Sequence, residues 1–306
     1  MLPPQVTTFV ALILIFTAAP RAQAVLFLYD GFAAGGSSPT GAQYLTGTAG
    51  ATSGDSLVRS VAGAADGQKP STIGFDPTVG WRTTSALSAA VYPRVNSTGL
   101  SYPGLPSVAG AADIFRSTTI AGSQVKFAAR AVAGGLAAGD TDLYFSALVQ
   151  FDTSVPGSFR FDEGAAQLTI GVTNAGKITI SDQVATLGTS TATFTGGTTY
   201  LLAAHVYNTN QIDLWLDPTD FQVESNNDAQ KLFAGLTLNT FTAGAALTDF
   251  RITSDTGNSI AAPDFIVDEV RGATTWQEAL GIPEPTTGML MLAGIAMLGA
   301  HRRARR

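Results

Sequence analysis

Short apolar runs separated by turn-forming residues recur along most of the chain. The clearest is the segment from Leu143 to Phe151, in which every second residue is apolar, as on one face of a β-strand. Other runs of about four to eight β-prone residues are bounded by Gly, Asn, Asp or Pro, which also favours strands. The strands predicted in this way are Val25–Tyr29, Leu57–Val61, Gln124–Val132, Leu143–Phe151, Ser158–Asp162, Gln167–Val172, Lys177–Ser181, Tyr200–Tyr207, Gln211–Leu216, Leu247–Ser254 and Phe265–Arg271.

The segments between these runs predict turns and loops. Asn174-Ala175-Gly176 and the segment from Asn208 to Asn210 favour hairpin connections, because Asn and Gly accept the positive φ of tight turns. Residues 274–280 predict a short final strand or a turn of helix. Loops are predicted for residues 33–67, for residues 71–106, which contain Tyr92-Pro93, and for residues 218–230.

Between its two ends the chain shows no helical pattern of three turns, no internal repeat and no linker that would separate two domains. Roughly ten to thirteen strands without helices indicate an all-β fold. We expect a single domain at residues 25–281. Strands that alternate inward and outward over two antiparallel sheets are typical of a jelly-roll β-sandwich.

The first 24 residues have the pattern of a secretory signal peptide. An apolar run from Phe9 to Ala19 precedes Ala22-Gln23-Ala24, in which Ala22 and Ala24 are the small residues that signal peptidase requires. The first eight residues contain no Lys or Arg, so only the α-amino group supplies the usual positive charge. We expect residues 1–24 to form a signal helix that signal peptidase removes after Ala24.

Residues 282–306 combine prolines, a short apolar run and a basic end. The run from Thr286 to Ala300 would rise about 22 Å as a helix, which is less than the roughly 30 Å hydrocarbon core of a bilayer. It therefore predicts a marginal, transient membrane anchor, with the arginines on the cytoplasmic side. The residues that define the pattern are Pro283, Glu284, Pro285, Arg302, Arg303, Arg305 and Arg306.

This order of Pro-Glu-Pro, short apolar helix and terminal arginines resembles the PEP-CTERM sorting signal of Gram-negative bacteria. The resemblance implies that a membrane-embedded exosortase recognises the tail. It also implies that the enzyme removes the tail as the protein is delivered to the cell surface or into an exopolysaccharide matrix, as in a biofilm. An ordinary tail anchor is the alternative.

The composition of the domain that remains after removal of the two ends excludes some partners and some chemistries. Charged residues make up 13% of the chain, about half the share in an average globular protein. Without the two ends, 12 basic and 22 acidic residues remain, and this acidic balance disfavours nucleic acid as a partner. The absence of cysteine excludes disulfides, thiol catalysis and zinc–thiolate sites.

The second half of the domain resembles the concanavalin A-like or laminin-G-like jelly rolls. The sequences that carry the resemblance are TYLLAAHVYNTNQIDLWLDP, then LTDFRITSD, then FIVDEVRGATTWQEAL, over about 80 residues. Because the first and last strands of such folds lie side by side, the resemblance implies that Leu28-Tyr29-Asp30-Gly31-Phe32 lies beside the closing strand.

Laminarinase-type hydrolases on this fold carry Glu-x-Asp-x-x-Glu on one strand, since a retaining pair needs carboxyl groups about 5 Å apart. The glutamates of the domain, none of which has that spacing, are Glu163, Glu224, Glu269 and Glu278. Asp162-Glu163 and Asp268-Glu269 are adjacent in sequence, and adjacent strand residues point to opposite faces. We therefore expect no enzyme. A glycoside hydrolase or lyase that uses two distant acids is the alternative.

A candidate carbohydrate-binding site lies on one face of the strands at 200–207 and 211–216. If the aliphatic residues of these strands point inward, four other side chains share an exposed surface: His205, Tyr207, Asp213 and Trp215. An aromatic ring beside a carboxylate suits a sugar, because the ring packs on C–H groups and the carboxylate accepts from hydroxyls. The alternative is that Trp215 is a core residue or covers a sheet edge, and that His205 only hydrogen-bonds a neighbour.

Other chemistries have less support. His205 is the only histidine of the domain and no Gly-x-Ser-x-Gly elbow is present, which disfavours a serine triad. Calcium remains open, because residues 217–228 and 249–258 are rich in Asp and Asn, although neither segment has EF-hand spacing. We expect no other cofactor. The sequence therefore predicts an exported, non-enzymatic protein that binds extracellular polysaccharide or has a purely structural role.

Overall fold

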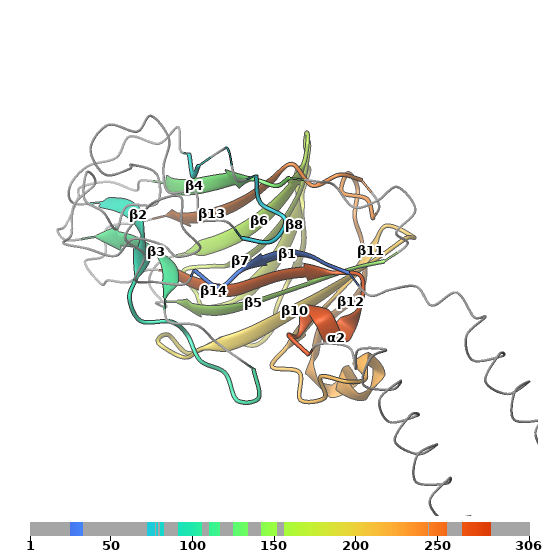
Figure 1. Cartoon of the computed structure of the whole chain (residues 1–306). Coiled ribbons are helices and arrows are strands. Elements are labelled where there is room, and N and C mark those ends of the chain that lie inside the picture. The colour runs from blue at the N-terminus through green and yellow to red at the C-terminus, as the bar shows by residue number, and fades with distance from the viewer. Residues whose placement is uncertain are drawn as a thin grey trace, which may run out of the picture.

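The computed structural model places the chain in two β-sheets that lie one over the other (Figure 1). It describes residues 25–32, 72–76, 78, 80–82, 91–105, 110–116, 125–133, 142–151, 156–243, 245–255 and 265–282. The predicted signal peptide, the tail from Pro283 onward and the predicted strand at 57–61 lie outside the described residues.

The larger sheet has eight antiparallel strands. Their order is β12-β11-β10-β5-β14-β3-β2, and β1 also pairs with β14. The strands are β1 (Leu26–Asp30), β2 (Val91–Asn96), β3 (Ala111–Arg116), β5 (Leu143–Phe151), β10 (Tyr200–Tyr207), β11 (Gln211–Leu216), β12 (Lys231–Thr237) and β14 (Phe265–Ala273).

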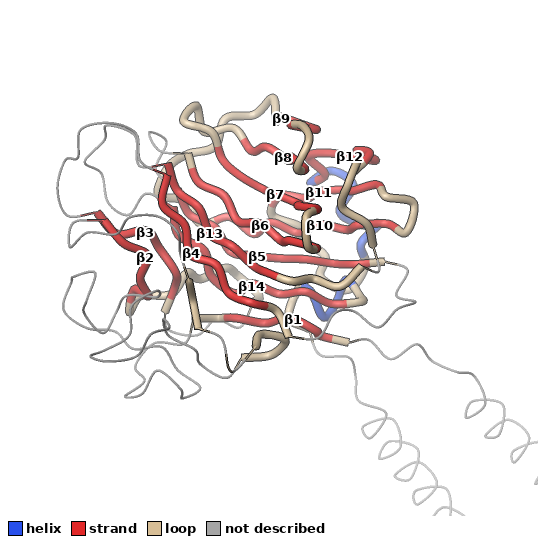
Figure 2. Tube along the Cα trace, turned by 90° about the horizontal axis from the view of Figure 1, so that it is seen from above, coloured by secondary structure: helices blue, strands red, loops and turns tan. Residues whose placement is uncertain are grey.

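The smaller sheet has six antiparallel strands in the order β4-β13-β6-β7-β8-β9 (Figure 2). The strands are β4 (Val125–Ala131), β6 (Gly157–Glu163), β7 (Ala166–Val172), β8 (Ile178–Asp182), β9 (Thr186–Thr189) and β13 (Asp249–Asp255). The all-β sandwich of two antiparallel sheets predicted from the sequence is confirmed, and its architecture is compatible with a jelly roll.

The first and last strands lie side by side, as the resemblance to concanavalin A-like folds implied. Leu26 lies opposite Ala273, and Asp30 lies opposite Val270. This pairing brings the beginning and the end of the domain to the same part of the larger sheet.

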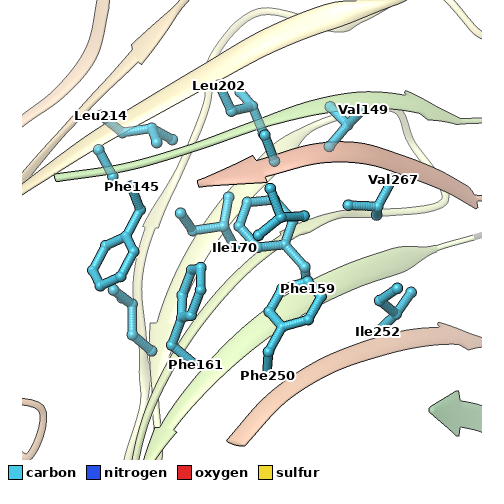
Figure 3. Close-up of a cluster of buried hydrophobic side chains, with 14 of the residues drawn as sticks. Phe145, Val149, Phe159, Phe161, Ile170, Leu202, Leu214, Phe250, Ile252 and Val267 are labelled. Carbon is cyan, nitrogen blue, oxygen red and sulfur yellow. The ribbon is translucent and has the colours of Figure 1, made fainter. Parts of the chain in front are cut away.

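The main hydrophobic core lies between the two sheets (Figure 3). Alternation along the strands points Phe145 of β5 at Phe161 of β6, and their stacked rings lie 4.2 Å apart between centroids. Phe250 of β13 packs against Phe161 at 5.4 Å. Burial of these rings is the dominant favourable contribution to folding in a chain without cysteines.

A buried ion pair joins the two sheets. Asp30 ends β1 in the larger sheet and Arg130 lies in β4 of the smaller sheet, with Oδ2 and Nη1 3.3 Å apart and both side chains fully buried. Arg130 also donates to the Thr72 hydroxyl at 2.9 Å and lies 4.7 Å over the Phe75 ring. These partners offset the cost of removing the charges from water, so either charge alone would be strongly destabilising.

The sequence did not predict β2, β3, β9 or β12. β2 contains Pro93, which indicated a loop, but β2 is an edge strand, where the missing N–H of proline is tolerated. β12 contains Gly235 at a φ of 59°, and its pairing with β11 shifts register, so the alternation of apolar residues is broken.

The described residues also form two short helices. α2 (Trp276–Ala279) is one of the two alternatives predicted for residues 274–280, and Thr275 caps it by accepting from the Glu278 N–H. The 3₁₀-helix η1 (Glu224–Gln230) lies in the segment predicted as an exposed loop. That prediction is wrong in part, because Asn227 is fully buried.

Candidate functional site

A second hydrophobic cluster lies on the outer face of the larger sheet. Side chains on both faces of β10 and β11 are largely buried. The outer face of these strands must therefore be covered by other parts of the chain, as the inner face is covered by the smaller sheet. The cluster includes Leu201 and Ala203 of β10, Trp215 of β11, and Trp276 and Leu280 of the α2 segment. The rings of Trp215 and Trp276 meet edge to face with centroids 5.1 Å apart.

Hydrogen bonds fix α2 and the segment around η1 over this face. The Trp276 indole N–H donates to the Asp220 carbonyl at 3.1 Å, and the Gln277 amide donates to the Gln222 carbonyl at 2.8 Å. The Ser146 hydroxyl of β5 donates to the Ala279 carbonyl. These bonds connect α2 to both the sheet and η1.

The segment before η1 is held by polar side chains rather than by regular structure. The Asn227 side-chain oxygen accepts from the Thr219 and Asp220 N–H groups at 2.8 and 2.9 Å. The Asp220 carboxylate accepts from the N–H groups of Gln222 and Val223, and hydrogen bonds from Asn226 and these amides lower the pKa of Asp220. The segment therefore has a defined conformation without strand pairing.

A cavity of about 650 Å³ lies between the outer face of the larger sheet, η1 and α2. The sheet contributes Tyr144, His205, Tyr207 and Trp215 to its wall. The remaining wall comes from residues 222–225, Asp228, Lys231 and residues 274–277. Its volume lies within the usual range for small-molecule sites, and the wall combines aromatic and polar groups.

His205 lies between two tyrosine rings in this wall. Its ring centroid is 4.1 Å from that of Tyr144 and 3.7 Å from that of Tyr207. Its Nδ1 lies 2.8 Å from Glu224 Oε1, and its Nε2 lies 3.7 Å from Asp142 Oδ2. The histidine thereby joins β10 to the start of η1.

Glu224 also accepts a hydrogen bond from the Tyr144 hydroxyl at 3.3 Å. Burial, together with the nearby Glu224 and Asp142 carboxylates, raises the pKa of Tyr144. Burial and the Asp213 hydrogen bond raise the pKa of Tyr207. Both tyrosine hydroxyls are therefore protonated donors at neutral pH.

Asp213 lies behind the wall and holds Lys231 in place. Its carboxylate accepts from the Tyr207 hydroxyl at 3.0 Å and the Gly235 N–H at 2.6 Å, and lies 2.9 Å from Lys231 Nζ. Burial would raise the pKa of Asp213, but the hydrogen bonds from Lys231, Gly235 and Tyr207 outweigh it and hold the pKa below its ordinary value. Lys231 Nζ lies 4.9 Å over the Trp215 ring.

The four residues predicted as a carbohydrate site share one face, but the predicted exposure is wrong. His205, Asp213 and Trp215 are only 4%, 5% and 0% exposed, and Tyr207 is partly buried. Trp215 is a core residue of the outer cluster, which was the alternative reading. His205, Tyr207 and Trp215 line the cavity, whereas Asp213 is not among its lining residues.

Several cavity residues were not predicted from the sequence. Tyr144 could have been found, because it lies on the opposite face of β5 from Phe145 and therefore on the same outer face as His205. Trp276 lies in the Thr-Trp sequence that carried the second resemblance. Nothing in the sequence indicated that Glu224 and Lys231 would be brought to this face by the irregular segment between them.

The adjacent acid pairs lie outside the cavity. Asp162 makes ion pairs with Arg160 and Arg251 at 2.6 and 3.3 Å. Glu163 accepts from the Thr242 N–H at 3.0 Å, and burial raises the pKa of Glu163 to about 7.

The sequence predicts that Asp268 and Glu269 point to opposite faces of a regular strand, but the strand is irregular at this position. β14 shifts register there, and Glu269 has a φ of 50°. Glu269 is held by Arg271 at 2.8 Å and by the Tyr29 hydroxyl at 3.1 Å. This carboxylate is thus part of a buried structural network.

Among the residues that the structure describes, no three His, Asp or Glu side chains are grouped so that they could hold a metal ion. In the first of the two segments considered for calcium, Asp217 accepts from the Leu201 N–H at 2.8 Å and Asp228 lies 3.3 Å from Lys231 Nζ. The second segment lies partly outside the described residues.

Residues 281–306 match the family model of the PEP-CTERM protein-sorting motif. The chain therefore carries this sorting motif, at the position that the resemblance indicated. The motif implies export followed by exosortase processing. Within the described part of the chain, no helix has the length and apolar character needed to span a membrane.

No curated protein matches the chain. Similar solved structures include a sialidase (12% identity, TM-score 0.31, 63% of this chain and 16% of the sialidase covered). The globular domain of Trypanosoma cruzi calreticulin matches at 10% identity and a TM-score of 0.39, over 73% of this chain and 95% of that domain. A structure described with the endo-acting O-glycanases by which human gut microbiota initiate mucin breakdown matches at 11% identity and a TM-score of 0.41, over 81% and 98% of the two chains. The chain thus spans about a sixth of the sialidase, and these scores are too low to carry a conclusion about function.

Proposed function

We propose that the domain is a non-enzymatic carbohydrate-binding protein of the cell surface or extracellular matrix, which holds polysaccharide in the cavity beside α2. The observation that carries the proposal is the cavity wall, in which the half-buried rings of Tyr144 and Tyr207 lie beside hydrogen-bonding groups. Aromatic faces pack on the C–H side of a pyranose, and polar side chains around them orient its hydroxyls.

The polar residues around the cavity fit a neutral polymer better than an anionic one. Lys231 is the only lysine or arginine among the described residues that line the cavity, and it is already paired with Asp213 and Asp228, at 2.9 and 3.3 Å. Glu224, which also lines the cavity, is engaged by His205 and Tyr144. The acidic side chains around the wall disfavour an anionic polymer, and we expect binding to a neutral one that is weak and little affected by salt.

The test is retention of the exported protein on immobilised xylan, cellulose, chitin and alginate, with reducing-sugar release measured in parallel. The proposal expects retention on at least one neutral polysaccharide and no release of sugar. Failure to bind any of these polymers would favour a purely structural role.

A glycoside hydrolase or lyase is the second candidate. The observation that favours it is the contact between His205 and Glu224 at 2.8 Å, because a histidine paired with a carboxylate can transfer protons. This candidate expects release of reducing sugar that is lost on Glu224→Gln substitution, whereas the non-enzymatic proposal expects no release from either protein.

A further inference from the structure

The two ends of the described domain meet beside α2 (Figure 1). The Val25 N–H donates to the Thr274 hydroxyl at 2.9 Å, and the Thr274 N–H donates to the Val25 carbonyl at 3.1 Å. The Ile282 N–H donates to the Gln277 carbonyl at 2.8 Å. The predicted signal peptide and the sorting motif therefore join the domain at the same short segment, residues 274–282.

The same segment forms part of the cavity wall. Residues 274–277 line the cavity, and the Gln277 side chain donates across it to the Gln222 carbonyl. Gln277 is joined by a hydrogen bond to Ile282, which is the last described residue. The cavity thus lies directly next to the point where the tail leaves the domain.

The described chain is closely packed up to the point where the tail begins. Leu280 is fully buried, and a Cβ on Gly281, which has a φ of 75°, would lie 2.0 Å from Arg271 Nη1, so the chain is closely packed up to this position. Pro283 follows Ile282 at once, and proline restricts the residue before it to extended conformations.

The apolar run begins at Thr286, four residues beyond Ile282. Four extended residues reach at most about 14 Å. The polar headgroup layer on one side of a bilayer takes up roughly 5 to 7 Å of that distance. When the run is in the membrane, Ile282, which lies beside the cavity rim, is therefore held within about 10 Å of the lipid surface.

We propose that the uncleaved tail holds the cavity rim against the lipid surface, so that polysaccharide reaches the cavity only after the tail has been processed. The surface involved is residues 274–277 together with the exposed residues Gln222 and Ser225 across the cavity. The regulation of binding rests on the proposed carbohydrate site. The placement of the rim at the membrane follows from the short connection alone.

The placement can be measured with single labels, since the chain contains no cysteine. Ser225→Cys puts a fluorophore at the cavity. Asn174→Cys, in the β7–β8 turn, is the matched control. This turn lies at the other end of the sandwich, because the nearby Val172 pairs with Gly157, and Gly157 packs on Phe265 at the start of β14. The α2 segment follows the end of β14.

Each labelled full chain is reconstituted in vesicles of phosphatidylethanolamine and phosphatidylglycerol that contain a headgroup quencher. The label at residue 225 is expected to be quenched at least twofold more than the label at residue 174. A Gly-Ser linker of about twelve residues inserted between Ile282 and Pro283, which adds roughly 20 Å of reach, should remove the difference. Equal quenching at the two positions without the linker would overturn the placement.

Binding of soluble xylan, hydroxyethylcellulose and alginate to the same vesicles tests the regulation. The chain without the linker is expected to bind at least tenfold more weakly than the chain with it. Equal binding by both would overturn the inference and leave the proposed function standing. If neither chain binds, and release by a protease site in the linker does not restore binding, the proposed function fails, and the inference about regulation fails with it.

Discussion

The two faces of the larger sheet are packed in different ways. The inner face meets the smaller sheet mainly through phenylalanine rings and aliphatic chains, such as Phe145 against Phe161, with the Asp30–Arg130 ion pair as a buried polar contact. On the outer face, Trp215 of β11 packs against Trp276 of α2, and both rings carry N–H groups. A mainly apolar interface gives stability, whereas a face that also presents polar groups beside a cavity can hold a ligand.

The inner face should be the more sensitive to substitution. Phe161 contacts Phe145, Phe159 and Phe250 and is fully buried. Phe161→Ala is expected to lower the free energy of unfolding by about 3–5 kcal/mol, because it leaves a cavity between the sheets. Urea unfolding measures this change, and a loss below about 1 kcal/mol would show that the two sheets do not depend on this contact.

The outer face should give a smaller and more local effect. Trp276→Phe removes the hydrogen bond to the Asp220 carbonyl and part of the contact with Trp215. We expect a loss of about 1–2 kcal/mol and faster amide hydrogen exchange in residues 217–231. Trp81→Phe, in the main core, is the control. If Trp81→Phe accelerates exchange in residues 217–231 as much as Trp276→Phe does, the inner and outer hydrophobic clusters are not independent.

Two carboxylic acids, Asp213 and Glu163, make the stability of the fold depend on pH in opposite directions. Asp213, beneath the cavity, has a lowered pKa, so its contribution to stability is present above the unfolded pKa and is lost as the pH falls through the folded one. Glu163, at the end of β6, has a pKa raised by burial to about 7 from 4.5. Between these values the unfolded chain has released the proton that the folded chain still holds, so stability falls as the pH rises.

Glu163→Gln should remove the fall in stability that Glu163 causes as the pH rises. The variant keeps an oxygen that can accept from the Thr242 N–H but has no proton to lose. We expect equal stability of the two proteins below about pH 4.5 and a growing advantage of the variant up to about pH 7. Urea unfolding between pH 4 and pH 8 measures the difference. A constant difference over that range would contradict the raised pKa.

Much of the sandwich could be predicted from the sequence because its central strands alternate cleanly. The predicted bounds of β5, β10 and β11 agree with the structure. Edge strands such as β2 and β12 could not be predicted, since β2 contains a proline and β12 contains a left-handed glycine and no fully buried side chain. Their pairing comes from neighbouring strands rather than from their own pattern.

The candidate site was predicted only in part, for a related reason. Period two placed His205, Tyr207, Asp213 and Trp215 on one face, but it could not show that this face is covered. The cover consists of α2 and η1, which are too short to give a helical period. Their positions depend on single contacts, such as the buried Asn227 and the Trp276 hydrogen bond.

Burial of Trp215 also decides which substitution tests binding. Removing a fully buried indole would disturb the whole outer cluster, so a loss of binding by Trp215→Ala would have no clear meaning. Tyr144 is a better probe, since it is half-buried and lines the cavity. Tyr29 provides the matched control. It is also half-buried, its hydroxyl also donates to a glutamate, and it is not among the residues that line the cavity.

The affinity of Tyr144→Ala and Tyr29→Ala for the retained polysaccharide, measured by titration calorimetry beside the unfolding free energy of each, tests the account most directly. We expect similar losses of stability in the two variants. Only Tyr144→Ala should lose affinity, by at least tenfold, or about 1.4 kcal/mol. Unchanged affinity of Tyr144→Ala, or equal losses in both variants, would contradict the proposal that the cavity beside α2 binds carbohydrate.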